Sequence, residues 1–370
     1  MTVGVSESLK QGLPRLEPCV SVPVGKHDVV IHAPGFEDRT MAIVESILPT
    51  PETRTVLLDY RPFNARNRLG DVRNALESRG VSIADTDILL YDRFDPEDFE
   101  ARLRLHLLAS QPRRVVIDIS TMSKLAILLI LSVCRGLDVE VTILYAEAKS
   151  YGPSREEFEK AKENNEIHRP TLQIFTGVHG VVRVSSLASV AMQGQPTAAL
   201  VFMSFNDALT QVLLNTVYPS RLFLINGRPP VHSWREEATA WIHDQVRREW
   251  EEDNPVVRTS PVGALVPRRA VSTLDYTETV SLLIGLYWQL SATHRVLLAP
   301  GGSKMQAVGC YLAKALHPDI HIEYPSPEGF LPEYSSQIAA RWTLNLGRLS
   351  GLLDAISVKE RREFLELSIS

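Results

Sequence analysis

The sequence reads Val115-Val116-Ile117-Asp118-Ile119-Ser120-Thr121-Met122-Ser123-Lys124 in its first half, and this stretch decides the fold. A second stretch, Val296-Leu297-Leu298-Ala299-Pro300-Gly301-Gly302-Ser303-Lys304, repeats its plan, with the two Ser-Lys pairs 180 positions apart. Each begins with an apolar run typical of a buried strand, continues into a turn, and ends where a helical pattern begins. A further predicted strand then ends in a tyrosine, Tyr145 or Tyr324. A strand that passes through such a turn into a helix is a common place for a phosphate or nucleotide to bind.

Strands alternate with helices on both sides of these stretches, which predicts mostly parallel sheets with crossover helices. We therefore expect an α/β protein with two tandem Rossmann-like parallel-sheet units related by internal duplication, followed by a helical C-terminal tail. The expected parts are an N-terminal lead (1–26), a first unit (27–153), a connecting helix and β insertion (154–197), a second unit (198–335) and the tail (336–370), read as one or two amphipathic helices.

Composition sets modest bounds on function. The 370 residues suit two domains, and 44% hydrophobic with 22% charged residues is ordinary for a globular protein. A formal net charge of −5 argues against a protein that coats long nucleic acids. Three cysteines show neither metal-ligand spacing nor a disulfide framework, and the run Leu125 to Cys134 is too short to span a membrane. We see no signal peptide and expect a cytoplasmic protein without a metal or other cofactor and without membrane contact.

The turn Gly301-Gly302-Ser303-Lys304 has the residue types that hold an anion. Two glycines let backbone N–H groups approach a ligand closely, Ser303 can cap the helix and donate its hydroxyl, and Lys304 adds a positive charge. The alternative is a glycine-rich turn with a capping serine and a solvated lysine. The sequence is not a Walker A loop.

The matching turn of the first half has hydroxyls where the second half has glycines. Ser120, Thr121, Ser123 and Lys124 are its candidate ligand-binding residues. Asp118, at the end of the strand, either braces the turn by accepting backbone N–H bonds or faces a ligand hydroxyl. Because this turn lacks the double glycine, we expect it to bind an anion less well, so that losing Lys304 weakens binding more than losing Lys124.

The loops after the first strand of each unit are the second set of candidates, because ligands of open parallel sheets lie beyond the carboxyl ends of the strands. In the first unit Gly35 permits a turn, and Arg39 either binds the ligand or forms a structural ion pair. In the second unit Ser204 and Asn206 either cap the following helix or bind the ligand. Three arginines of the long loop before residue 273, which either bind a polyanion or solubilise the surface, are Arg258, Arg268 and Arg269.

The Gly301–Lys304 turn resembles the Gly-Gly-Thr-Lys motif after the fourth strand of the CRISPR-associated Rossmann fold (CARF) sensors. Thr121-Met122-Ser123-Lys124 then looks like a degenerate copy, and Gly35–Thr40 and Ser204–Asp207 correspond to the family's first-strand loop. The resemblance implies a fused pseudo-dimer that binds a nucleotide or cyclic oligonucleotide in a cleft shared by the two units. It also implies a role in antiviral (phage) defence through a protein effector partner.

Two other functions stay open at this point. One is a metal-independent phosphodiesterase of the ring-nuclease kind, in which the candidate catalytic residues are Ser303, Lys304 and Lys124. The other is a non-catalytic structural subunit of a defence complex.

Overall fold

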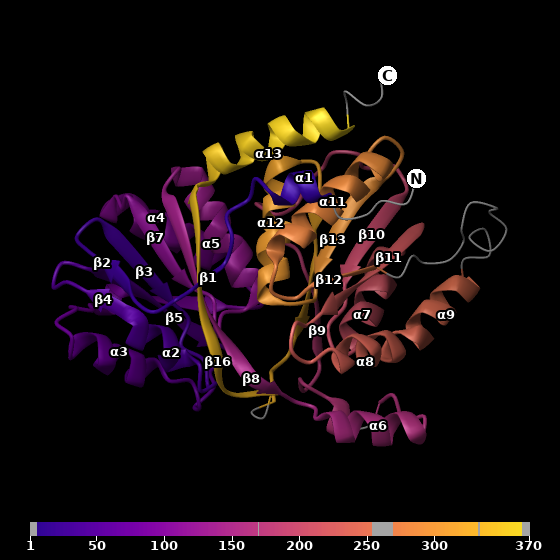
Figure 1. The fold of residues 1–370 in the computed structure, drawn as a ribbon, viewed down its shortest axis with the longest axis horizontal. Coiled ribbons are helices and arrows are strands. Elements are labelled where there is room, and N and C mark those ends of the chain that lie inside the picture. The colour runs from indigo at the N-terminus through magenta and orange to yellow at the C-terminus, as the bar shows by residue number, and fades with distance from the viewer. Residues whose placement is uncertain (1–5, 169, 254–268, 332–333, 365–370) are drawn as a thin grey trace. The chain divides into compact units, whose positions relative to one another are not determined.

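The computed structural model describes residues 6–168, 170–253, 269–331 and 334–364. The chain divides into two compact units (Figure 1). The first unit comprises Leu13–Tyr151 and Pro332–Ile356, and the second comprises Met1–Gly12, Gly152–Leu331 and Ser357–Ser370. Part of the expected N-terminal lead and the end of the expected tail therefore group with the second unit.

The first unit is built on a seven-stranded sheet with helices on both faces. Its elements in chain order are β1 (Glu17–Pro18), β2 (Val22–Val24), β3 (Asp28–His32), α2 (Thr40–Ser46), β4 (Ile47–Pro49), β5 (Arg54–Arg61), α3 (Leu69–Glu77), the 3₁₀ helix η1 (Asp85–Asp87), β6 (Ile88–Asp92), α4 (Pro96–Ser110), β7 (Arg114–Asp118), α5 (Lys124–Leu137), β8 (Glu140–Tyr151) and β16 (Ser335–Arg348).

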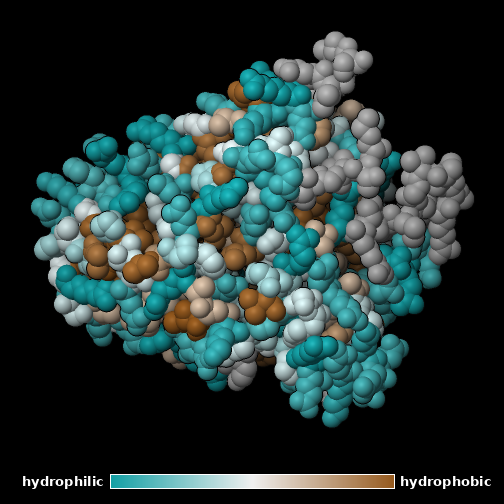
Figure 2. Space-filling view, in the orientation of Figure 1, coloured by the Kyte–Doolittle hydropathy of each residue, from teal (hydrophilic) through white to brown (hydrophobic). Residues whose placement is uncertain are grey.

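The order of the parallel strands in this sheet is β6-β5-β3-β7-β8. Numbered along the chain, this order is 3-2-1-4-5, so the strand order reverses between β3 and β7. Figure 1 shows α2 and α3 on one face and α4 and α5 on the other. Leu125 to Leu131 of α5 are all buried, as the apolar sequence of this helix predicts. Figure 2 also shows a hydrophobic patch over β2 and β4, where Val20 and Leu48 are exposed.

The prediction of a purely helical tail is wrong for its first part. Residues Ser335–Arg348 form β16, which pairs antiparallel with β8 from Ser335↔Tyr151 to Arg348↔Glu140. Only the following segment is helical, as α13 (Leu349–Phe364). The physical reason is that β8 runs on past Tyr145 to Tyr151 and offers a long edge of backbone groups, which β16 satisfies.

The second unit contains a five-stranded parallel sheet. Its elements in chain order are α1 (Glu7–Lys10), α6 (Arg155–Glu163), η2 (Pro170–Leu172), β9 (Val178–Val182), β10 (Thr197–Phe202), α7 (Ala208–Val217), β11 (Arg221–Arg228), α8 (Trp234–Ile242), α9 (Asp244–Asp253), β12 (Arg269–Ser272), α11 (Tyr276–Leu290), β13 (Arg295–Pro300), α12 (Lys304–Leu316), β14 (His321–Ile322) and β15 (Tyr324–Pro327).

The strands of this second sheet lie in the order β12-β11-β10-β13-β14, which is again 3-2-1-4-5. The predicted repeat of a Rossmann-like α/β unit is therefore present in the fold. Figure 1 shows α11 and α12 on one face of the sheet and α7, α8 and α9 on the other. The apolar core on the α7 side joins residues of three neighbouring strands, among them Val201, Leu224 and Leu297. The β insertion contributes β9, which pairs antiparallel with β15 outside this sheet.

Candidate functional site

Each Ser-Lys turn lies where the strand order of its sheet reverses. In the first unit the turn 119–123 follows β7, which pairs with β3, and in the second unit the turn 301–303 follows β13, which pairs with β10. The loops after β3 and β10 leave from the neighbouring strands at the same carboxyl edge. Both sets of predicted residues are thus at the edge where open parallel sheets bind ligands.

Asp118 braces the turn of the first unit. One of its carboxylate oxygens accepts the Ser120 backbone N–H at 3.0 Å and the Ser120 hydroxyl at 2.5 Å. The other lies 3.2 Å from Nδ1 of His32. The Ser120 hydroxyl oxygen also accepts the Ala146 N–H at 2.8 Å. Asp118 and Ser120 are buried and saturated by these bonds, which favours the bracing role over contact with a ligand.

His32 is a buried polar residue beside Asp118. Its Nε2 is buried and has no hydrogen-bond partner within the described part of the chain. It lies at the end of β3, in register with Asp118.

Thr121 and Gly35 join the two loops of the first unit. The Thr121 hydroxyl donates to the Ala33 carbonyl at 2.6 Å. A Cβ at Gly35 would come 2.9 Å from Cβ of Thr121, so glycine is what allows this close approach. The predicted meeting of the loops after the first and fourth strands is therefore present, and these two residues form part of it.

Ser123 caps α5 and is held by two tyrosines. Its hydroxyl accepts the Ala126 N–H at 3.2 Å and contacts the Tyr91 hydroxyl at 3.1 Å. Its N–H donates to the Tyr60 hydroxyl at 3.0 Å, while burial raises the pKa of Tyr60 to about 12. The tyrosines come from the ends of β6 and β5. Ser123 therefore anchors the helix start, and its hydroxyl is already engaged.

Lys124, which directly follows this turn, has no counter-charge among the residues that the structure describes. It is the first residue of α5 and is half-buried. Its ammonium makes no hydrogen bond or ion pair to any residue that the structure describes. Burial lowers the pKa of Lys124 to about 8. An ammonium held at a helix N-terminus without a carboxylate is poised to meet an anion.

Arg39 forms a structural ion pair. It is 1% exposed, and its Nη2 lies 2.7 Å from a carboxylate oxygen of Glu37. Burial disfavours its charge, but Glu37 and the hydroxyls of nearby tyrosines outweigh that effect and raise the pKa of the guanidinium. Ser335 donates a hydrogen bond to the same Glu37 oxygen, which ties β16 to this pair. Of the two roles left open for Arg39, the buried pair is the one that its contacts support.

The two glycines of the second turn are required by packing. A Cβ at Gly301 would come 2.4 Å from the Phe202 carbonyl oxygen at the end of β10. A Cβ at Gly302 would come 2.1 Å from Oε1 of Gln306. Neither glycine has a positive φ. The double glycine therefore lets the turn lie against the neighbouring strand and the start of its own helix.

Ser303 and Gln306 form a reciprocal cap on α12. The Ser303 hydroxyl accepts the Gln306 N–H at 3.1 Å, and the Gln306 side chain accepts the Ser303 N–H at 2.8 Å. The Ser303 hydroxyl also donates to the Thr273 carbonyl at 2.6 Å. Ser303 is thus engaged as both donor and acceptor, while Lys304, the next residue, is half-buried at the start of α12.

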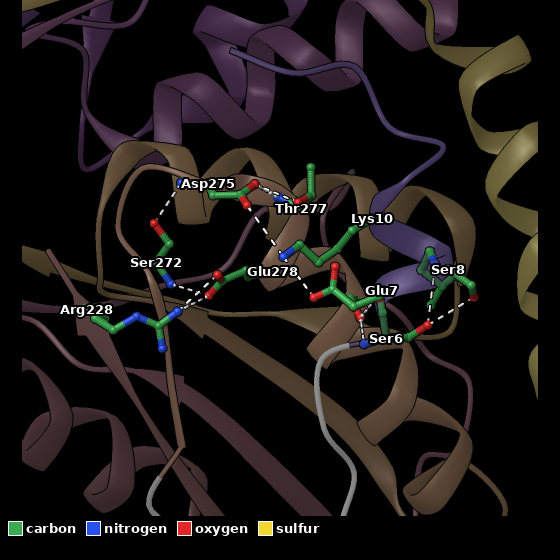
Figure 3. A network of polar contacts seen from close by, with 11 residues as sticks. Ser6, Glu7, Ser8, Lys10, Arg228, Ser272, Asp275, Thr277 and Glu278 are labelled. Carbon is green, nitrogen blue, oxygen red and sulfur yellow. Dashed lines mark hydrogen bonds and ion pairs between the residues drawn. The ribbon is translucent and has the colours of Figure 1, made fainter. Parts of the chain in front are cut away.

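A polar network joins Arg228 and Ser272 to the start of α11 (Figure 3). Arg228 forms two bonds to the Glu278 carboxylate, at 2.7 and 3.0 Å, and Glu278 accepts the Ser272 N–H at 2.8 Å. The Ser272 hydroxyl accepts the Asp275 N–H at 2.9 Å, and Lys10 lies 4.0 Å from Asp275. These charges are matched within the unit, so the network fixes the β12–α11 loop beside the turn.

Ser204 and Asn206 also have local partners. The Ser204 hydroxyl donates to the Asn206 carbonyl at 2.5 Å. The Asn206 side chain accepts the Ala208 N–H at 2.8 Å and donates to Gln173 at 2.5 Å. These bonds order the loop that leads into α7, whose N-cap residue Asp207 has no side-chain capping bond. Asn206 thus holds one N–H of the first helical turn, whereas Ser204 bonds only within the loop.

The second unit also has a cavity of about 460 Å³ that the sequence does not reveal. It is lined by Met203, Leu224, Asn226, Ser233, Glu236, Glu237, Ala240, His243, Asp244, Arg247, Arg269 and Ala270. Burial lowers the pKa of His243 to about 4, and its ring nitrogens are engaged with Thr210 and the Thr239 carbonyl. Of the three predicted loop arginines, Arg269 lines this cavity, while Arg258 and Arg268 lie outside the described residues.

Comparison with known proteins shows no family for this chain. No protein-family model matches the chain, and no curated protein matches it either. Within residues 6–168, 170–253, 269–331 and 334–364, no group of three or more His, Cys, Asp or Glu side chains is placed to hold a metal ion. None of the helices in those ranges is long and apolar enough to cross a membrane. Together, the fold and the two turns define an α/β protein with two Rossmann-like sheets.

Proposed function

We propose that this protein is a sensor that binds a nucleotide or a cyclic oligonucleotide at its Ser-Lys turns and passes the signal to a protein partner. The assignment to antiviral defence rests on the resemblance to CARF sensors. The observation that carries the binding proposal is Lys124, whose ammonium has no partner among the described residues and lies at the first turn of α5. Phosphate is the anion most often bound at such a position.

The contacts of the turn show which groups are left for a ligand. The Ser120, Thr121 and Ser123 hydroxyls all have partners inside the first unit. The backbone N–H groups of Lys124 and Leu125 have no acceptor among the described residues, as expected for the first turn of a helix. We therefore assign phosphate binding to the Lys124 ammonium and these two N–H groups.

Thermal unfolding in the presence of ligands tests this proposal. The panel contains cyclic tetra-adenylate, cyclic hexa-adenylate, linear oligoadenylate and ATP, and a bound ligand raises the melting temperature because it stabilises the folded state. We expect Lys124→Ala and Lys304→Ala to reduce the shift. Lys26→Ala and Lys160→Ala, which remove exposed lysines elsewhere in each unit, are the matched controls. A panel without any shift, together with a stably co-purifying protein, contradicts the sensor and points to a structural subunit.

A second function, a metal-independent phosphodiesterase, is favoured by the same lysine. With a pKa of about 8, Lys124 can hold or release a proton near neutral pH, as general acid–base catalysis requires. Ser303 fits this role less well because its hydroxyl is engaged as both donor and acceptor. Cleavage of cyclic oligoadenylate by the wild type in chelator, lost in Lys124→Ala, selects this function. Binding without cleavage selects the sensor.

A further inference from the structure

Two phenylalanines are exposed where β5 and β6 end. Phe63 is 72% exposed and Phe94 is 36% exposed. The strands are paired to their ends at Arg61↔Asp92, and the Arg93 N–H donates to the Arg61 carbonyl at 3.3 Å. The loops that carry the two rings therefore leave the sheet side by side, at the same carboxyl edge as the Lys124 turn.

The loop with Phe63 borders the Lys124 turn. The Arg68 N–H donates to the Gly35 carbonyl at 3.2 Å, and Gly35 packs on Thr121 of that turn. On the strand side of the loop, Tyr60 accepts the Ser123 N–H, one residue before Lys124. The loop 62–68 is thus fixed at both ends to groups that belong to the candidate phosphate site.

Positive charge accompanies the exposed ring. The Arg61 guanidinium lies 5.9 Å from the centre of the Phe63 ring and 3.1 Å from Asp59. Arg68 pairs with Asp71 at 2.8 Å. Arg66 is exposed; its backbone N–H donates to Asn64 at 3.0 Å, and its guanidinium makes no ion pair or hydrogen bond to the described residues.

Three carboxylates that flank the two loops in the sequence already have partners. Asp59 and Asp71 pair with the arginines, and Asp92 accepts the Phe94 N–H at 2.9 Å. The side chains of Arg66 and Lys124 have no carboxylate partner among the described residues, so both are available to an anionic ligand. An aromatic face beside unpaired cations is the combination that binds single-stranded nucleotides, with the base stacked on the ring and the phosphate on the cations.

We propose that Phe63 is a stacking platform for a base of the nucleotide whose phosphate binds at Lys124, with Arg66 as a second phosphate contact. This inference rests on the proposed function and adds to it the residue that recognises the base. Phe63 then distinguishes nucleotides from inorganic phosphate, which has no base to stack.

The experiment measures the dissociation constants of cyclic tetra-adenylate, cyclic hexa-adenylate, ATP and pyrophosphate at one salt concentration. We expect Phe63→Leu to raise the dissociation constants of the nucleotides about ten-fold to a hundred-fold and to leave that of pyrophosphate unchanged. Phe63→Trp should keep the affinity, and its added fluorescence, taken as the difference from wild type, should be quenched when a base stacks on it. Leu105→Ala, at a residue of α4 in the same unit that is 67% exposed, is the matched control and should change nothing.

The outcomes separate the two proposals. If the wild type binds a nucleotide whose affinity neither Phe63→Leu nor Arg66→Ala changes, that result overturns the role of the loop, while the proposed function stands. Equal weakening of pyrophosphate and nucleotide by Phe63→Leu also overturns base stacking, because it shows a general disturbance of the turn. A wild type that binds none of the four ligands overturns the proposed function and this inference with it.

Discussion

Lys124 holds a charge where a purely structural residue would not. The ammonium is half-buried, and the described residues offer it no carboxylate, so the protein loses hydration energy without a compensating pair. A hydrophobic residue of similar length would fill the same space at no electrostatic cost. Destabilising groups of this kind are typical of ligand sites, where a charge that lowers the stability of the fold is needed to bind the ligand.

This cost can be measured through pH. The pKa of Lys124 is about 8 in the folded protein and near 10.5 when unfolded, so between these values the unfolded chain binds more protons and stability rises with pH. Below pH 8 the penalty is fully present. We expect Lys124→Met to stabilise the protein by about 1 kcal/mol at pH 7, a value reduced for partial exposure. The gain should shrink as the pH approaches 10.

Chemical denaturation at pH 7 and pH 10 gives the difference in unfolding free energy between Lys124→Met and the wild type at each pH. Lys26→Met, at an exposed lysine, should show no such pH-dependent difference. A Lys124→Met variant that is less stable than wild type at pH 7 contradicts the absence of a partner for this ammonium.

Alanine substitutions at Gly301 and Gly302 are expected to destabilise the fold by different amounts. An alanine Cβ at Gly301 meets a backbone carbonyl at 2.4 Å, which cannot move without the strand, whereas at Gly302 it meets the movable Gln306 side chain. We expect Gly301→Ala to destabilise by about 2 kcal/mol or more, and Gly302→Ala by about 1 kcal/mol, the worth of a lost cap. Gly70→Ala, in α3 with nothing within 4 Å, should be neutral or slightly stabilising. Thermal unfolding of the three variants tests this ranking.

At the scale of elements, β16 is the feature that most alters the sequence interpretation. Its backbone pairs antiparallel with β8 over nearly its whole length, so the alternate amides that face β8 should be protected from solvent. We expect hydrogen exchange to be slow from Arg341 to Leu346 and fast in β1, the two-residue strand at the sheet edge. Peptide-level exchange followed by mass spectrometry gives the comparison. Fast exchange throughout 335–348 contradicts the strand.

The reason the sequence conceals β16 is the absence of alternation. Only Ser335, Leu344 and Leu346 of its fourteen residues are buried, so neither a strand nor a helix period is strong. The strand is specified by its partner β8, nearly two hundred residues earlier. By contrast, β7 and β13 are continuous apolar runs next to short turns, and their signals are local. They could be predicted for that reason.

The candidate site divides in the same way. Helix starts at Ser123 and Ser303 could be predicted because a cap is a local pattern. The ion pair of Arg39 is one of its two predicted roles, but the sequence could not decide between them, because Ser335, which binds its partner Glu37, is almost three hundred residues away. The exposure of Phe63 was also hidden, since a phenylalanine after a strand is more often part of a core.

At the scale of the whole chain, the two sheets have the same strand order, but the turns at their carboxyl edges differ in chemistry. The second turn has more glycine, yet its glycines serve packing and its serine is fully bonded. The first turn leads into Lys124, whose ammonium has no partner within the described part of the chain. The sequence favours Lys304 as the stronger contact, whereas these contacts favour Lys124. We therefore expect Lys124→Ala to weaken nucleotide binding at least as much as Lys304→Ala.

Ligand stoichiometry shows whether the two turns act as one site or two. The resemblance to CARF sensors predicts one cyclic oligonucleotide for both turns, so native mass spectrometry of the 41.3 kDa chain should show a single bound ligand. Each single lysine variant should then keep that stoichiometry with lower affinity, because either change acts on the same binding event. Two ligands on the wild type, falling to one in each variant, contradict a shared ligand. The duplication would then have produced two independent nucleotide sites, each needing only its own lysine.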